Sequence, residues 1–199
     1  MRKAILHLKK ADPVLAAIID RVGSYRMSYD EPGFASLAEA IVYQQLHGKA
    51  AATIFRRLTD LTGLPLEPEG ILKLSDAQMR AAGLSKQKLS YLRDLAAKTQ
   101  SGEVGFSHLA ELSDEDVIRE LTRVKGIGVW TAHMFLIFSL HRANVLPTGD
   151  LGIQMAMRKH YGKRKAPKPV QMARIAKCWE PYRSVACWYL WRSLDINTL

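Results

Sequence analysis

SDEDVIRELTRVKGIGVWTAHMFLIFSLHRANVLPTGDLGI, residues 113–153, is the stretch that decides the fold we expect for this chain. It predicts a helix from Ser113, a tight glycine turn at residues 124–128 and a second helix from about Val129. A proline-containing loop follows, and Asp150 then opens a third helix, because aspartate is among the preferred N-cap residues. The stretch therefore predicts two helices joined by a short hairpin, with an aspartate just beyond them.

Nearly every other segment also carries the apolar spacing of an α-helix, and no segment shows convincing strand alternation. We therefore expect an all-α fold of about ten helices in two lobes with a cleft between them. Residues 34–142 are expected to form a central lobe that ends in the helix-hairpin-helix. Residues 1–33 together with residues 143–199 are expected to form the second lobe, in one compact unit with the first.

The composition indicates a globular protein with a polyanionic partner. The 199 residues include 29 Lys and Arg against 19 Asp and Glu, and no acidic residue occurs between Leu151 and Trp179. Such an excess of positive charge favours nucleic acid or an anionic membrane surface as the partner. No apolar run is long enough to span a bilayer. We expect an intracellular protein, in the cytoplasm with the nucleoid if bacterial and in the nucleus if eukaryotic.

Two cysteines, Cys178 and Cys187, are present. That number excludes a disulfide framework and an iron–sulfur cluster held by four cysteines. No grouping of His, Cys, Asp and Glu has the spacing of metal ligands.

The hairpin is a candidate phosphate-binding site. Gly126 and Gly128 allow positive φ and close approach of the backbone, and the helix that begins near Val129 presents the amides of its first turn. Lys125 adds a positive charge, and Thr131 lies one turn into the helix. An ordinary turn with a glycine cap would use the same residues, but the basic composition favours phosphate binding.

Asp150 has two compatible interpretations. Taken alone it is a helix N-cap, one of the commonest positions for aspartate. The amides and dipole of the helix it opens also favour a charged carboxylate. Such a group suits a reaction that develops positive charge at a sugar C1′ or that must orient a water molecule.

KGIGVWTA followed by VLPTGDLGI resembles the helix-hairpin-helix DNA glycosylases, and most closely the alkylation-repair branch of 3-methyladenine DNA glycosylases of type II. AEAIVYQQLHGKAA and CWEPYRSVACWYLW are similar to two further segments of that branch, so the resemblance covers most of the chain. The N-terminal β domain of some members is not expected here, because the chain begins in a helical pattern. We therefore expect the compact form.

The resemblance implies roles for the hairpin and for Asp150. Asp150 matches the family's essential aspartate, which stabilises the ribosyl cation and positions water. Trp130 stands where glycosylase-lyases carry a lysine, so no Schiff base with C1′ is expected and the activity should be monofunctional. The family also binds a monovalent cation, Na⁺ or K⁺, through hairpin carbonyls that correspond to Thr122, Val124 and Ile127. No other cofactor is implied.

The resemblance also implies a pocket for a flipped base and a residue that fills the gap in the duplex. Trp130 and Trp191 match aromatic positions of that pocket, with Tyr43 and Trp188 as weaker candidates. Trp179 and Trp188 are expected in the core. His47 corresponds to the intercalating position, although a solvated turn histidine is the simpler alternative. Gln44 and Gln45 are either minor-groove contacts or solvated residues.

These observations predict a monomeric, monofunctional DNA glycosylase that hydrolyses the N-glycosidic bond of alkylated purines in duplex DNA, such as 3-methyladenine and 7-methylguanine. One alternative is a related glycosylase for deaminated or oxidised bases. The other is a noncatalytic helix-hairpin-helix module that only binds DNA.

Overall fold

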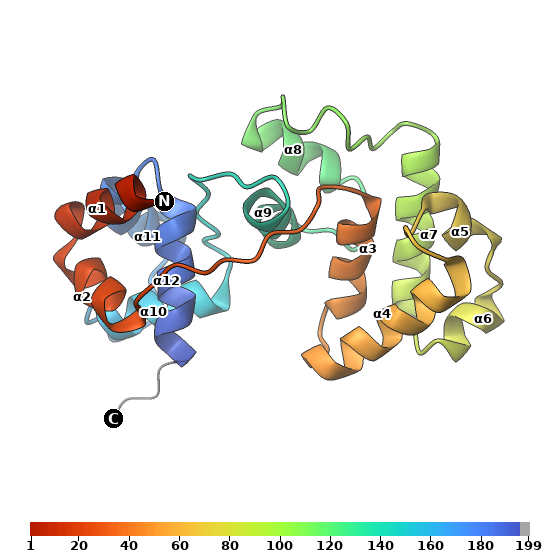
Figure 1. Cartoon of the computed structure of the whole chain (residues 1–199), viewed down its shortest axis with the longest axis horizontal. Helices are drawn as coiled ribbons and strands as arrows, with labels where there is room; N and C mark the ends of the chain where they lie inside the picture. The colour runs from red at the N-terminus through yellow and green to blue at the C-terminus, as the bar shows by residue number, and fades with distance from the viewer. Residues whose placement is uncertain (196–199) are drawn as a thin grey trace. The chain divides into compact units, whose positions relative to one another are not determined.

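The computed structural model describes residues 1–195, and this part of the chain is helical throughout, with no strand. The all-α expectation is thus confirmed (Figure 1). In chain order the helices are α1 (Arg2–Ala11), α2 (Pro13–Val22), α3 (Phe34–Tyr43), α4 (Gly48–Thr62), α5 (Pro68–Lys73), α6 (Asp76–Ala81), α7 (Lys86–Gln100), α8 (Asp114–Leu121), α9 (Val129–Phe138), α10 (Leu151–His160), α11 (Pro169–Ile175), the 3-10 helix η1 (Ala176–Trp179) and α12 (Arg183–Asp195).

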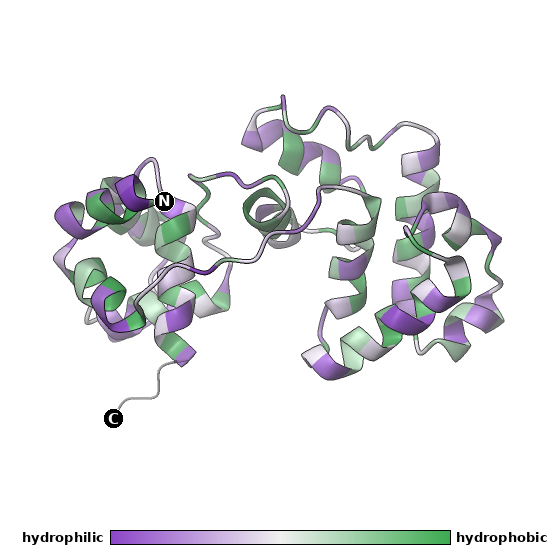
Figure 2. Cartoon of the chain, viewed as in Figure 1, coloured by the Kyte–Doolittle hydropathy of each residue, from purple (hydrophilic) through white to green (hydrophobic). Residues whose placement is uncertain are grey.

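The chain divides into two compact units. Unit 1 combines Met1–Tyr29 with His141–Leu199, and unit 2 is the continuous segment Asp30–Leu140. Hydrophobic and hydrophilic residues alternate along the helices of both units, as expected for helices with one buried face (Figure 2). Among residues 1–195, no helix has both the length and the hydropathy that crossing a bilayer requires.

Unit 1 is built around α12, which packs against α2 and α10. Trp179 and Tyr189 are fully buried in its core, and Trp188 is 6% exposed, so the core positions expected for Trp179 and Trp188 are confirmed. The pattern at residues 170–179 predicts a single helix, whereas α11 ends at Ile175 and the last turn tightens into η1. Such 3-10 turns are common where an α-helix ends.

Asp12 is the polar centre of unit 1. As the sequence predicts, it is the N-cap of α2, and its Oδ1 accepts hydrogen bonds from the amides of Val14 (2.9 Å) and Leu15 (3.1 Å). Its Oδ2 accepts from the Tyr161 hydroxyl (2.6 Å) and the Trp179 indole (2.7 Å). Asp12 is only 6% exposed, so four donors satisfy one buried carboxylate and connect three segments of the chain.

Unit 2 places the hairpin between α8 and α9, which pack against each other. Ser113 caps α8 by accepting from the amide of Asp116, and the acidic residues of the first turn lie where the helix dipole favours them. The next helix, α9, buries Ala132, Phe135 and Leu136, while α3 packs against α7, α4 and α9. The two helices that flank the hairpin are therefore held by packing, α8 against α9 and α9 against α3.

We expect Asp12→Ala to lower the free energy of unfolding by about 2–4 kcal/mol, because it leaves buried donors of Tyr161 and Trp179 without their acceptor. The measurement is urea denaturation followed by circular dichroism. Asp20→Ala is the control: Asp20 pairs with Lys9 at 2.6 Å, but its side chain is 62% exposed. That change should cost less than about 1 kcal/mol. Equal losses in the two variants would contradict the central role of Asp12.

Candidate functional site

The hairpin between α8 and α9 is a short turn whose shape depends on glycine. Gly126 has φ +81°, in the left-handed region, and the amide of Ile127 donates to the carbonyl of Val124 at 3.1 Å. Gly128 is extended and forms the N-cap of α9. The chain thus reverses within a few residues, as the glycine spacing predicts.

Gly126 also lies directly against an aromatic ring. A Cβ atom at this position would be 2.1 Å from Cδ2 of Tyr91, a residue of α7. The carbonyl of Gly126 accepts a hydrogen bond from the side-chain amide of Gln44 at 2.9 Å. Gly126 is therefore required twice, for its backbone conformation and for the contact with Tyr91, and the hairpin is held by α7 and by the segment after α3.

Asp94 of α7 holds the first half of the hairpin. Its Oδ2 accepts from the amide of Lys125 at 2.8 Å and is 3.0 Å from the Lys98 ammonium, which also donates to the carbonyl of Arg123. Burial opposes ionisation of Asp94, but the Lys125 amide and then Lys98 outweigh it and hold the pKa of Asp94 below its ordinary value. The Lys125 side chain remains 67% exposed and lies 3.7 Å from the other Asp94 oxygen.

The N-terminus of α9 presents backbone donors. The first hydrogen bond within the helix runs from the amide of Ala132 to the carbonyl of Gly128 at 3.0 Å, so the amides before Ala132 belong to the turn that an α-helix does not pair itself. Val129 is 53% exposed there. Thr131, two residues further along α9, is only 6% exposed.

A cavity of about 690 Å³ lies beside the hairpin, entirely within unit 2. Trp130 is 45% exposed and contributes one wall, and Tyr43 at the end of α3 contributes another. Burial and the neighbouring Glu39 carboxylate, with which its hydroxyl is hydrogen-bonded, raise the pKa of Tyr43. The structure thus brings together two of the three expected pocket aromatics. The full lining is Ala40, Tyr43, Gln44, Gln45, Leu46, Ser85, Gln87, Lys88, Tyr91, Gly126, Trp130, Thr131 and Met134.

The turn between α3 and α4 projects an apolar side chain that the sequence interpretation overlooked. Gln45 has φ +57°, an uncommon conformation for a residue other than glycine. Leu46, which follows, is 40% exposed and lines the cavity, while the exposed His47 is the N-cap of α4. Leu46 is the one leucine in the break QQLHG between two predicted helices. An apolar side chain in a polar turn could have indicated a contact residue.

Asp150 lies in unit 1 and is held by two donors on one oxygen. It is the N-cap of α10, as predicted, and its Oδ1 accepts from the amide of Ile153 and from the indole of Trp191, each at 2.8 Å. Asp150 is 8% exposed. Burial and the nearby Asp150 carboxylate raise the pKa of the Cys187 thiol. The Ile153 amide of α10 and the Trp191 indole of α12 fix the orientation of the Asp150 carboxylate.

Gly152 makes this arrangement possible, and the sequence interpretation did not single it out. A Cβ atom there would lie 3.0 Å from Cδ1 of Trp191 and 3.1 Å from Oδ1 of Asp150. Both distances are tighter than ordinary contact, so a side chain would push the indole away from the carboxylate. A glycine two residues after a capping aspartate was the signal in the sequence.

The predicted site residues fall into both units. Unit 1 contains Asp150 and Trp191, which are hydrogen-bonded. Unit 2 contains all the others, namely Tyr43, His47, Thr122, Val124, Lys125, Gly126, Ile127, Gly128, Val129, Trp130 and Thr131. Within residues 1–195, no group of three or more His, Cys, Asp or Glu side chains is placed to hold a metal ion.

Backbone carbonyls remain as possible cation ligands. Those of Thr122, Val124 and Ile127 follow the C-terminal end of α8, where the helix dipole favours positive charge. The Val124 carbonyl already accepts from Ile127 and retains a second lone pair. Such oxygen donors suit a hard cation, so the residues present fit a monovalent ion.

Comparison with known proteins gives consistent matches over nearly the whole chain. A family model described as HhH-GPD superfamily base excision DNA repair protein matches residues 38–181. DNA-3-methyladenine glycosylase 1 of Schizosaccharomyces pombe is 38% identical over 200 residues, which cover 97% of this chain and 87% of that protein. A Schizosaccharomyces pombe 3-methyladenine DNA glycosylase (Mag1) in complex with abasic DNA is similar with a TM-score of 0.86 at 36% identity, covering 98% of each chain. A DNA-3-methyladenine glycosidase from Bacillus halodurans has a TM-score of 0.88 at 36% identity, covering 97% of this chain and 89% of that one.

We expect Gly126→Ala to destabilise the protein by about 2 kcal/mol or more, because the new methyl group meets Tyr91 in a backbone conformation that alanine disfavours. Gly128→Ala is the matched control, since Gly128 has φ −98° and no atom lies within 4 Å of its ideal Cβ. Thermal and urea unfolding of both variants measure the difference. A Gly126→Ala variant as stable as Gly128→Ala would show that the Tyr91 contact does not constrain the hairpin.

Proposed function

The chain belongs to the HhH-GPD superfamily of base excision DNA repair proteins, and we propose that it is a DNA-3-methyladenine glycosylase that removes alkylated bases from duplex DNA. The observation that carries the proposal is the buried Asp150 carboxylate, oriented by the Trp191 indole and by the first turn of α10. A module that only binds DNA would gain nothing from a carboxylate held beside its DNA-binding residues, because the phosphate backbone would repel it.

Asp150 acts on the sugar. As the C1′–N bond breaks, its electron pair leaves with the base and positive charge develops at C1′, where a carboxylate stabilises it. A water molecule then forms the new C1′–O bond and loses a proton, for which Asp150 provides an acceptor. Because the Ile153 amide and the Trp191 indole both donate to Oδ1, the orientation of the carboxylate is fixed before the reaction begins.

The aromatic residues select the base. A purine methylated at N3 or N7 carries a positive charge, which is attracted to electron-rich ring faces. Trp130 and Tyr43 line one cavity in unit 2, and Trp191 adds an indole beside Asp150 in unit 1. A cationic base is also a good leaving group, so the reaction needs little acid assistance. This favours alkylated bases over uncharged deaminated or oxidised ones.

The hairpin and the turn after α3 position the DNA. The amides of Gly128 and Val129 at the N-terminus of α9, with Lys125 and Gly126 beside them, bind a backbone phosphate. Leu46 and His47 together fill the space that the flipped nucleotide leaves. The carbonyls of Thr122, Val124 and Ile127 would hold a Na⁺ or K⁺ ion, which would add positive charge to the hairpin. No other cofactor is required.

We propose that the protein is an intracellular monomer. Unit 2 supplies the hairpin, and unit 1 supplies Asp150.

Asp150→Asn should abolish release of 3-methyladenine while keeping the affinity for DNA. Asparagine retains a side-chain oxygen for the α10 amide and the Trp191 indole, so the fold survives, but it cannot neutralise the cation at C1′. Mass spectrometry of bases released from methylated DNA measures the loss, and circular dichroism checks the fold. Base release at the wild-type rate would exclude Asp150 as the catalytic group.

Release of deaminated or oxidised bases instead of methylpurines by the wild-type protein would favour the alternative specificity.

Borohydride should trap no covalent complex between this protein and DNA, because the hairpin position of the lyase amine holds Trp130. The product should be an intact strand with an alkali-labile abasic site. Denaturing electrophoresis after incubation with borohydride measures both properties. A trapped adduct, or strand cleavage without alkali, would overturn the assignment as a monofunctional enzyme.

A further inference from the structure

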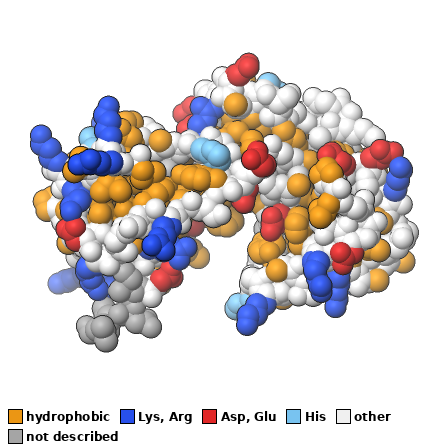
Figure 3. Space-filling view, viewed as in Figure 1, with side chains coloured by type: hydrophobic (Ala, Val, Ile, Leu, Met, Phe, Trp, Pro, Cys, Tyr) orange, Lys and Arg blue, Asp and Glu red, His pale blue; other side chains and the backbone are white. Residues whose placement is uncertain are grey.

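The positive charge of the chain is concentrated in unit 1. This unit contains 17 Lys and Arg residues against 5 Asp and Glu, a formal net charge of +12. Unit 2 contains 12 against 14, a formal net charge of −2. The hairpin therefore belongs to the unit with a slight negative charge, which repels a polyanion weakly. Long-range electrostatic attraction to DNA must come from unit 1. Several Lys and Arg side chains are visible on the face of unit 1 in Figure 3.

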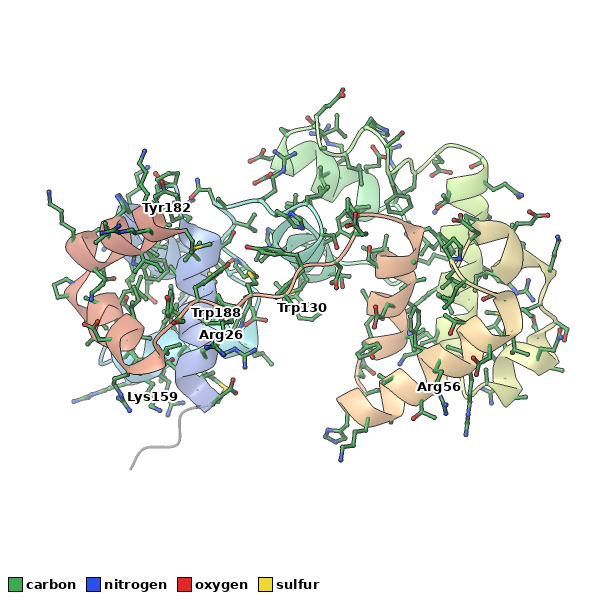
Figure 4. All side chains as sticks on the ribbon, in the orientation of Figure 1. Arg26, Arg56, Trp130, Lys159, Tyr182 and Trp188 are labelled. Atoms are coloured by element: carbon green, nitrogen blue, oxygen red, sulfur yellow. The ribbon has the colours of Figure 1, made fainter. Side chains whose placement is uncertain are left out.

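Two arginines of unit 1 border the same hollow. It has a volume of about 370 Å³ and is lined by Val22, Ser24, Arg26, Trp188 and Arg192. Arg26 follows the end of α2, whereas Arg192 is in the last turn of α12. The guanidinium carbon of Arg192 lies 5.8 Å from the centre of the Trp188 ring, which supports its position by a cation–π contact. Figure 4 labels Arg26 and Trp188 in this unit.

The surroundings of the hollow are also positive. A smaller hollow that shares Val22 is lined by Arg21 and His160, and Lys159 precedes His160 on α10. Burial, and after it the charges of Lys159 and Arg21, lower the pKa of His160. Within residues 1–195, no acidic side chain forms an ion pair with Arg21, Arg26 or Lys159.

One acidic residue pairs with an arginine of the hollow. Asp195 pairs with Arg192 at 2.9 Å, but the two side chains are 65% and 54% exposed. A pair this exposed contributes little, because water screens it and two long side chains must be held in one geometry. An incoming phosphate can therefore replace Asp195 as the partner of Arg192.

We propose that this hollow is a second binding site for a DNA backbone phosphate, separate from the hairpin, with Arg26 and Arg192 as its ligands and Ser24 as a further donor. The proposal rests on the proposed function for the identity of the partner. Arginine presents a planar fork of donors that matches two phosphate oxygens, so two arginines that line one hollow suit this ligand. Trp188 lines the hollow but is only 6% exposed, so it offers little surface on which a base could stack.

A double variant with a matched control tests the site. Arg26→Ala with Arg192→Ala removes two charges from the hollow, and Arg56→Ala with Arg57→Ala removes two from the exposed surface of α4 in unit 2. Fluorescence anisotropy gives the Kd of an undamaged duplex from 0.05 to about 0.3 M KCl. The slope of log K against log salt should become shallower by about 1.8 in the first variant, with affinity lowered about tenfold at 0.1 M KCl.

The control should change Kd less than about threefold, since screened charges outside a contact act weakly. Equal effects of the two double variants, or an unchanged slope in the first, would overturn the proposal. If loss of the Arg192 packing on Trp188 unfolds the double variant, Arg26→Ala alone tests the site, because Arg26 is exposed and outside any helix. Its slope should become shallower by about 0.9.

A titration separates backbone phosphate from a free ligand. Inorganic phosphate and a nucleoside monophosphate are added separately while the NMR signals of the Arg192 and Trp188 side chains are followed. Shifts only at millimolar concentrations, together with the change in salt slope, support a backbone contact. Micromolar binding of the monophosphate with an unchanged duplex slope would overturn it. Because these measurements use undamaged DNA, an absence of base release would contradict the proposed function and leave the test of this site intact.

Discussion

The Oδ1 atom of Asp150 is the point on which the unit 1 part of the candidate site depends. It accepts from the first turn of α10 and from the Trp191 indole of α12 at the same distance, 2.8 Å. One atom thus fixes the start of a helix, the position of an aromatic ring and the direction of the carboxylate. The absence of a side chain at Gly152 permits the close approach of all three. The cap of α10 and the carboxylate that we propose as the catalytic group are here the same side chain.

The hairpin follows a similar principle in unit 2. Gly126 is required by the contact with the Tyr91 ring as much as by the turn. From two other segments, Gln44 donates to the Gly126 carbonyl and Asp94 accepts from the Lys125 amide. The donors at the start of α9 are therefore held rigid before any ligand arrives, which lowers the entropy lost on binding. Asp94 also places a negative charge beside Lys125. In the proposed contact with a phosphate, the hairpin would consequently use oriented amides, whereas the excess positive charge is in unit 1.

The sequence predicted the features that act over short distances. The caps at Asp12 and Asp150 were predicted correctly, because a capping side chain binds an amide two or three residues away. The all-α fold followed from helical periodicity, and the family from several motifs that occur together. Exposure of Trp130 followed from its place at a helix start. The end of α11 was missed because a 3-10 turn has no clear sequence signal.

The sequence by itself determined the helices, the hairpin and the residue types that could bind phosphate and stabilise a cation. Only the tertiary structure decided that Trp191 donates to Asp150, 41 residues away, and that Gln44 binds Gly126, 82 residues away. It also decided that Leu46 lines the cavity and that Arg26 and Arg192 share a hollow. The reason is that caps and turns are local interactions of the backbone, whereas a site is made by side chains that meet only after their helices have packed.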